Sequence, residues 1–167
     1  MTTPAQLRKY AQPLLTPGML ARGFDISQKG LKFYRKAGDI YHFVIPTLVG
    51  MRDQIIVHLV PWVPEIMVGY DMKEFPERIA DVVLANLTPT KVEHVGSSRW
   101  TIEPETRAQT SFSEILGAFD HHGLPWFDRI VSREALANIV YPSERIDALG
   151  NNTADLILFR GEPKLPS

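Results

Sequence analysis

The residue types that could do chemistry are few, and two of them stand in matching positions. Residues 40–44 and 56–60 each have the pattern of a strand centred on a histidine, His42 in the first and His58 in the second. If the hairpin register pairs even-numbered with even-numbered residues, the two imidazoles share a face and lie close enough to bind one ligand. A slip of one residue places them on opposite faces.

A metal site at this pair would need a third ligand from another strand. The candidates are His94, Glu93 and Glu103. No spacing rule brings any of them there, and the simpler interpretation is two partly buried histidines held by hydrogen bonds beneath a helix. We therefore predict no metal and no other cofactor, and keep a metal-dependent enzyme using His42 and His58 as an alternative.

The triplet Asp120-His121-His122 matches a signature of manganese-dependent phosphoesterases. In that chemistry the triplet follows a strand and is joined by further aspartate motifs that hold two metal ions. Here it ends an amphipathic helix, where a histidine interacts favourably with the helix dipole. We assign the triplet a structural role.

A basic stretch offers a different kind of site. Residues 22–36 contain five lysines and arginines against Asp25 alone, although the whole chain has a net charge of -1. Strand alternation places Lys32, Tyr34 and Lys36 on one face, which makes them the candidate anion-binding residues. Cations beside an aromatic ring suit phosphate or single-stranded nucleic acid. The same charges also protect a sheet edge from aggregation, so nucleic-acid binding is kept as the alternative function.

Known catalytic patterns are missing from the sequence. The chain has no cysteine, which excludes disulfides, thiolate metal sites and cysteine nucleophiles. It also has no phosphate-binding glycine loop, no Gly-x-Ser-x-Gly elbow, no His-Glu-x-x-His and no dinucleotide fingerprint. We name no catalytic residue and do not expect an enzyme.

Three tryptophans are the candidate partner-binding residues, namely Trp62, Trp100 and Trp126. Tryptophan is enriched among the residues that dominate binding energy at protein interfaces. We therefore favour a non-enzymatic protein-interaction module, immunity-like or regulatory, that holds a protein partner on these rings or on a helix-free sheet face. The sequence leaves the oligomeric state open.

The elements that must position these residues follow from the hydrophobic pattern. A helix capped by Thr3 should reach residue 21 and end at Gly23. Three adjacent strands follow, over residues 31–35, 39–48 and 54–60, and their short turns predict an antiparallel meander. Pro46 and Pro61 should lie at a strand end, an edge or a bulge.

The second half of the chain is expected to add mainly helices. The expected elements are a helix over 76–87, strands over 91–95 and 99–102, a helix from Ser111 to a left-handed cap at Gly123, helices over 133–140 and 144–149 that follow Ser132 and Ser143, a strand over 155–160 and a tail over 161–167. This order predicts one α+β domain over residues 1–167, with an antiparallel sheet covered by helices mainly on one face.

Several short motifs carry a resemblance to a known family. They are Gly23-Phe24, Lys29-Gly30, Phe33-Tyr34-Arg35, Gly38-Asp39 and Gly123-Leu124-Pro125. In these residues the chain resembles a bacterial family catalogued as domain of unknown function 4304. The resemblance implies a single α+β domain and no known activity. The strand after Asp39 has His42 and Pro46 where that family has polar residues, so no shared ligand is implied.

The expected location is the cytoplasm, without contact to a membrane. No apolar run approaches the ~20 residues that cross a bilayer. The first residues also lack the apolar core of a secretion signal.

Overall fold

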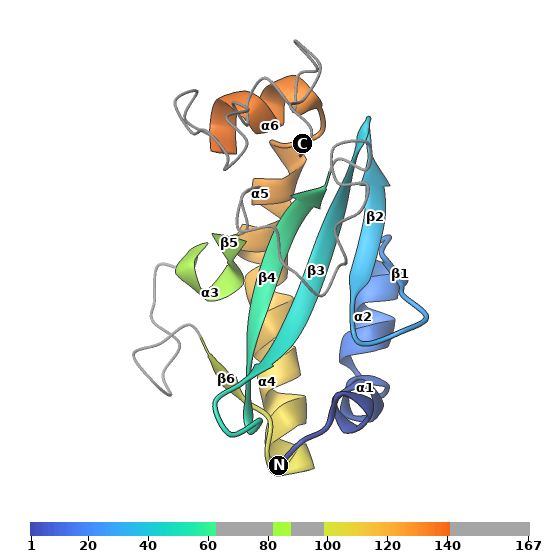
Figure 1. Ribbon diagram of the computed structural model, residues 1–167, viewed down its shortest axis with the longest axis vertical. Helices are drawn as coiled ribbons and strands as arrows, with labels where there is room; N and C mark the ends of the chain where they lie inside the picture. Colours follow the sequence, from blue (N-terminus) through green and yellow to red (C-terminus); the bar gives the residue numbers. More distant parts are fainter. Residues whose placement is uncertain (63–81, 88–98, 141–167) are drawn as a thin grey trace, which may run out of the picture.

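The computed structural model describes residues 1–62, 82–87 and 99–140, and its centre is an antiparallel sheet (Figure 1). The strands are β1 Asp25–Ile26, β2 Phe33–Ala37, β3 Ile40–Val49, β4 Gln54–Trp62, β5 Val82–Val83 and β6 Trp100–Thr101. Their order is β1-β2-β3-β4-β5, and β6 also pairs with β4. The predicted α+β class and the meander of β2, β3 and β4 are confirmed.

Several of the helices lie along one side of this sheet. The helices are α1 Pro4–Ala11, α2 Leu15–Ala21, α3 Leu84–Leu87, α4 Glu105–Ala118, the π-helical turn η1 Phe119–Gly123, α5 Leu124–Asp128 and α6 Arg133–Val140. Figure 1 shows α2, α4 and α5 behind β2, β3 and β4. Phe112 and Phe119 from this layer share one core cluster with Val57 and Leu59 of β4.

The strand register decides which side chains meet the helices. Between β3 and β4, His42 lies opposite Pro61 and Ile45 lies opposite His58, so odd-numbered residues pair with even-numbered ones. Directly paired residues point to the same face of a sheet. The even residues of β3 and the odd residues of β4 therefore form the helix-covered face, and the remaining residues form the open face, which no described helix covers.

The two strand prolines lie where the lost N–H does least harm to the sheet. Pro46 pairs with Val57, but it lies beyond Val44, the last residue of β3 that pairs with β2. Pro61 is next to the end of β4. Both positions agree with the expected edge or strand end.

The first predicted helix is two helices. Thr3 caps α1 as expected, since its side chain accepts the N–H of Gln6 and its own N–H donates to the Gln6 side chain. The helix ends at Ala11, two residues before Pro13, which has no N–H to continue the helical hydrogen bonds. The chain turns again after α2 at Gly23, whose φ of 83° is favourable only for glycine.

The helix that was expected to begin at Ser111 starts earlier. Its first residue is Glu105, after Pro104, and it is continuous through Ser111. The Ser111 hydroxyl is buried and donates to the carbonyl of Thr101, 2.5 Å away, instead of capping a helix. The capping pattern at Ser111 was misleading because a serine hydroxyl can serve the tertiary structure equally well.

Gly123 does not terminate its helix. Its φ is -73°, so it is not a left-handed cap, and the chain continues through η1 into α5. The glycine serves close packing, because a Cβ at this position would lie 2.5 Å from Cδ2 of Phe119. Both a left-handed helix cap and a close contact with another side chain require glycine, so the sequence alone could not distinguish them.

Other predicted elements are confirmed in part. Residues 100–101 form β6, and the Ser132 hydroxyl accepts the N–H of Ala135 at the start of α6. Of the helix expected over 76–87, the structure describes only β5 and α3. The elements expected over 91–95, 144–149 and 155–160, with the tail, lie outside the described residues. Within the described part of the chain, no helix has the length and apolar character needed to cross a membrane.

Candidate functional site

His42 is fully buried on the helix-covered face, and both its ring nitrogens are engaged. Nδ1 accepts a hydrogen bond from Nε of Arg35 at 3.2 Å, and Nε2 lies 2.5 Å from the carbonyl oxygen of Ile130. Because Nδ1 accepts, Nε2 carries the proton and donates to that carbonyl. The ring also stacks on Phe127, with centroids 4.2 Å apart. His42 is therefore a neutral imidazole with a fixed tautomer.

Burial lowers the pKa of His42 to about 4, against an ordinary value of 6.5. The loss of hydration is the main cause, and the positive charge of Arg35 acts in the same direction. The hydrogen bond to Ile130 and the charge of Asp128 oppose the shift without cancelling it. The imidazole has no exposed edge, so it cannot exchange protons with a substrate.

Arg35 extends this network to the surface. Its Nη2 lies 2.9 Å from Oδ1 of Asp128, and its guanidinium sits 5.0 Å from the ring centre of Phe24. The Arg35 side chain on β2 thus contacts His42 of β3, Phe24 after α2 and Asp128 at the end of α5. We call this set, made of Arg35, His42, Asp128 and the Ile130 carbonyl, the His42 junction.

The turn between β2 and β3 packs against residues 131–133, beside the His42 junction. Gly38 has a φ of 61°, and a Cβ on it would lie 2.0 Å from the carbonyl oxygen of Val131. Next to it, Oδ2 of Asp39 lies 3.9 Å from Nε of Arg133 at the start of α6. The hairpin end and residues 128–133 therefore fit together so closely that only glycine is accommodated at the turn.

His58 lies on the open face, and the condition for a shared histidine site is not met. The register is offset from the one that would pair even with even, so His42 and His58 point to opposite faces of the sheet. Residues 1–62, 82–87 and 99–140 contain no cluster of three or more histidine, aspartate and glutamate side chains able to hold a metal ion. The shared face that the metal-dependent alternative needs is therefore not formed by His42 and His58, and the third-ligand candidates His94 and Glu93 lie outside the described residues.

The three tryptophans have different environments. Trp100 pairs with Ile55 in the sheet and is only 2% exposed, so it is a core residue and cannot contact a partner. Trp126 packs on Phe127 in the helical layer. Trp62 is at the end of β4 on the open face. Of the predicted set, Trp62 and Trp126 keep exposed surface, and they belong to different layers.

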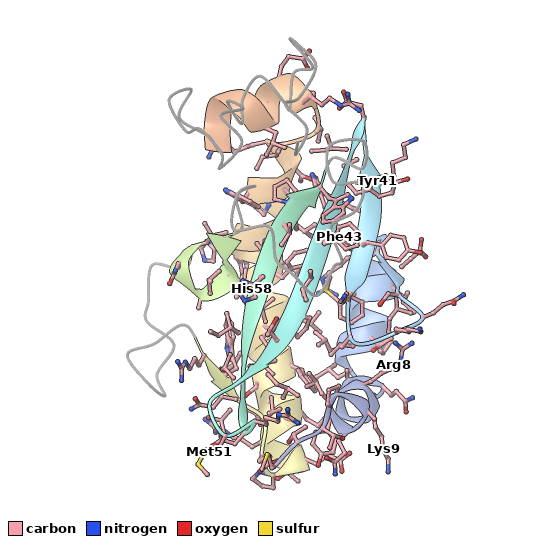
Figure 2. The ribbon with its side chains drawn as sticks, viewed as in Figure 1. Arg8, Lys9, Tyr41, Phe43, Met51 and His58 are labelled. Atoms are coloured by element: carbon pink, nitrogen blue, oxygen red, sulfur yellow. The ribbon has the colours of Figure 1, made fainter. Side chains whose placement is uncertain are left out.

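An aromatic row crosses the open face beside Trp62. Phe43 is at its centre, with ring centroids 5.8 Å from Tyr34 and 5.7 Å from Trp62. Tyr41 pairs directly with Trp62. Figure 2 shows Tyr41 and Phe43 on this face together with His58. We call Tyr34, Tyr41, Phe43 and Trp62 the aromatic row; all four are half-buried.

The basic stretch is partly neutralised. Arg22 forms two hydrogen bonds with Asp120, of 2.5 Å and 2.7 Å, and Arg35 pairs with Asp128. The bond to Arg22 is the main cause that lowers the pKa of Asp120. Two of the five cations that suggested an anion site are thus committed to internal contacts.

The three predicted anion-binding residues, Lys32, Tyr34 and Lys36, do not all lie together in the structure. Tyr34 and Lys36 pair with Phe43 and Tyr41 and share the open face, as alternation predicted. Lys32 lies in the loop just before β2 and not within a strand. The structure therefore brings Tyr34 and Lys36 together but leaves Lys32 at the opposite end of β2.

The Asp120-His121-His122 triplet does not end a helix as expected, because the chain continues through η1 directly into α5. It lies in η1, between α4 and α5, and not after a strand. Asp120 accepts from Arg22 and so ties this turn to the end of α2. The arrangement offers no second metal-binding motif among the described residues.

Comparison with known proteins gives no assignment. No protein-family model matches the chain, and neither a curated protein nor a solved structure matches it. The resemblance to domain of unknown function 4304 therefore stays a prediction. Several of its motif glycines have a direct physical reason, since Gly23, Gly30 and Gly38 all have positive φ.

The His42 junction is the arrangement that the sequence did not reveal. Arg35 and His42 are close in the chain, but Asp128 and Ile130 lie about ninety residues further on. The pairing of a half-buried arginine with a histidine on the neighbouring strand had one visible signal, the placement of Arg35 on the same strand face as Phe33. Its partners could be found only from the tertiary structure.

Proposed function

We propose that this chain is a non-enzymatic protein-interaction module that binds a protein partner on the aromatic row of the open sheet face. The observation that carries the proposal is the set of contacts around Phe43, which lies between Tyr34 and Trp62 on a face without a described helix. Half-buried tyrosine, phenylalanine and tryptophan side chains supply large contact area at low entropic cost.

The centre of the open face supports the same interpretation. Ile45 and Val60 at this centre are 7% and 2% exposed, whereas the four rings of the aromatic row beside them are half-buried and keep accessible area. Tyrosine hydroxyls and the indole N–H provide polar groups at the rim of an apolar surface. A partner that offers apolar side chains and a few hydrogen-bond acceptors or arginines would fit it.

The chemistry of the described histidines supports a binding role more than a catalytic one. His42 has the strongly shifted pKa that often marks a functional residue, but both its nitrogens are engaged inside the protein. A general acid or base must reach the proton that it transfers. The perturbation at His42 is explained by burial in a structural network.

Site-specific cross-linking tests the proposal. A photoreactive amino acid at Tyr41 is compared with the same group at Glu114, an exposed position on α4 in the helical layer. We expect a single cross-linked protein of defined mass from Tyr41 in cells that produce the chain, and none from Glu114. The cross-link should disappear when Trp62→Ala is added, because this change removes part of the aromatic row.

Two results would contradict the proposal. Equal cross-linking from Tyr41 and Glu114 would mean that the aromatic row has no preference for a partner. A product that survives Trp62→Ala unchanged would place the contact elsewhere. The folded state of each variant is checked by circular dichroism, so that loss of the cross-link is not confused with unfolding.

A further inference from the structure

A second surface, independent of the aromatic row, forms where α1 meets the loop between β1 and β2. Nη1 of Arg8 donates to the carbonyl oxygens of Ser27, at 2.9 Å, and Gly30, at 2.5 Å. These bonds hold the last turn of α1 against a loop that lies about twenty residues further along the chain. Figure 2 shows Arg8 between the helix and the loop, with Lys9 on the same helix.

This contact gathers cations that are separate in the sequence. The last turn of α1 contributes Arg8 and Lys9, and the loop region contributes Lys29 and Lys32. The Lys32 side chain lies close to the loop glycine that Arg8 binds, since its Cε is 4.0 Å from the position of a Cβ built on Gly30. We call Arg8, Lys9, Lys29 and Lys32 the α1–loop surface.

Among the described residues, no carboxylate neutralises the charges of this surface. Arg22 and Arg35 have aspartate partners, whereas no described acidic side chain forms an ion pair with a member of the α1–loop surface. Lys9 and Lys29 are exposed. The first 36 residues contain seven lysines and arginines and one acidic residue, Asp25, in a chain whose net charge is -1. The positive charge is therefore local.

We propose that the α1–loop surface binds the phosphodiester backbone of a nucleic acid. Lysine and arginine side chains whose charge is not paired with a carboxylate are what a polyanion recognises, and such binding does not depend on base sequence. Ser27 and Gln28 add neutral polar groups in the same loop. Arg8 is already held by two carbonyls, so its guanidinium is presented with little loss of side-chain entropy on binding.

A membrane is a poorer fit to the same charges. Peripheral binding to lipid usually combines cations with apolar side chains that enter the interface. The exposed large hydrophobic residues among the described ones are Met1, Leu20, Met51 and Val131, and none of them belongs to α1 or to the loop. The surface offers charge without an apolar anchor.

The α1–loop surface differs from the anion site expected from the sequence. Lys36 is four residues from Lys32, which corresponds to about 13 Å along a strand, and it lies near the opposite end of β2. Arg8 and Lys32 instead both lie beside Gly30, the first through a hydrogen bond to its carbonyl oxygen and the second through its Cε. The two sets can therefore be separated by substitution.

The test measures binding of fluorescent oligonucleotides as a function of salt concentration. Single-stranded and duplex probes of equal length are used with the intact chain, the double variant Lys9→Gln/Lys29→Gln, and the control Lys36→Gln/Arg129→Gln. The control removes the same charge from exposed positions outside the surface. Arg8 is kept, because its loss would also loosen the loop.

We expect salt-dependent binding by the intact chain and the control. Each phosphate contact adds about 0.7 to the salt slope for a single strand, so the double variant should lower the slope by about 1.4. Absence of binding to both probes at low ionic strength would overturn the proposal, and so would equal losses in the variant and the control. Binding to anionic vesicles but not to oligonucleotides would show that the partner is lipid and would also overturn it.

Discussion

The two faces of the central sheet both carry a histidine and a tryptophan, but these side chains are buried on one face and half-buried on the other. On the helix-covered face, His42 and Trp100 are at most 2% exposed, and both ring nitrogens of His42 are engaged in hydrogen bonds. On the open face, His58 and Trp62 are half-buried, and Trp62 packs edge-on against Phe43. The residue type alone therefore does not identify a functional side chain in this protein.

The difference separates residues that hold the fold from residues that can meet a partner. A buried histidine or tryptophan already has its contacts satisfied inside the molecule, so changing it costs stability. A half-buried aromatic residue retains area that a partner can cover. Substitutions that are matched across the two faces test this separation directly.

The largest expected contrast is between the two tryptophans. Trp100→Ala should lower the free energy of unfolding by about 3–5 kcal/mol, because it leaves a cavity in the core. Trp62→Ala should cost about 1 kcal/mol, since its ring is already in partial contact with water. Chemical denaturation of both variants measures the two values. Equal costs would mean that the open face is as much a part of the core as the other face.

The next largest expected effect is a loss of folding stability at acidic pH that is caused by His42. Folding lowers the pKa of His42 from 6.5 to about 4, so between these values the unfolded chain binds a proton that the folded chain does not. The stability it contributes is complete above pH 6.5 and falls as the pH decreases toward 4, by about 3 kcal/mol in all.

Denaturation curves measured between pH 4.5 and 7 check this prediction. His42→Gln should flatten the dependence, because the titrating group is removed, whereas His121→Gln, which removes an exposed imidazole, should retain it. The lowered pKa of Asp120 acts below this window. A steep dependence that persists in His42→Gln would contradict the assignment to the buried face.

The smallest of the three effects sharpens the role of the His42 junction. Gly38 and Gly23 both have positive φ, but a Cβ on Gly38 would meet the Val131 carbonyl at 2.0 Å, whereas one on Gly23 would have no neighbour within 4 Å. Gly23→Ala should cost about 1 kcal/mol from backbone strain alone. Gly38→Ala should cost about 2 kcal/mol or more, since the hairpin end must also move.

Thermal unfolding of the two glycine variants gives the comparison. If both lose the same stability, the close contact between the hairpin end and residues 128–133 has no energetic weight. If Gly38→Ala also raises the pKa of His42 toward its ordinary value, the turn and the buried imidazole belong to one unit.

Local patterns predicted the elements well where one physical requirement governs a position. The Thr3 cap, the strands around His42 and His58, and the turn at Gly23 all depend on neighbours within a few residues. The prediction failed where one residue type serves two requirements. Ser111 and Gly123 matched helix caps, but the structure uses the first to hold β6 and the second to admit Phe119.

The functional candidates depended on information that local patterns do not contain. His42 and His58 were symmetrical in the sequence, and their separation followed from a register set by the hairpin as a whole. Trp100 and Trp62 were likewise equivalent until the sheet pairing placed one against the helices. The aromatic row forms because the registers of β2 with β3 and of β3 with β4 bring the aromatic residues of three strands to the same face.

The sequence by itself determined the α+β class, the antiparallel order of the central strands and the absence of any cysteine chemistry, because these follow from composition and from contacts between near neighbours. The tertiary structure decided which face each histidine and tryptophan occupies, which cations are neutralised, and which distant cations meet at Arg8. Those outcomes depend on register and on packing between segments far apart in the chain, and a one-residue shift in pairing reverses them.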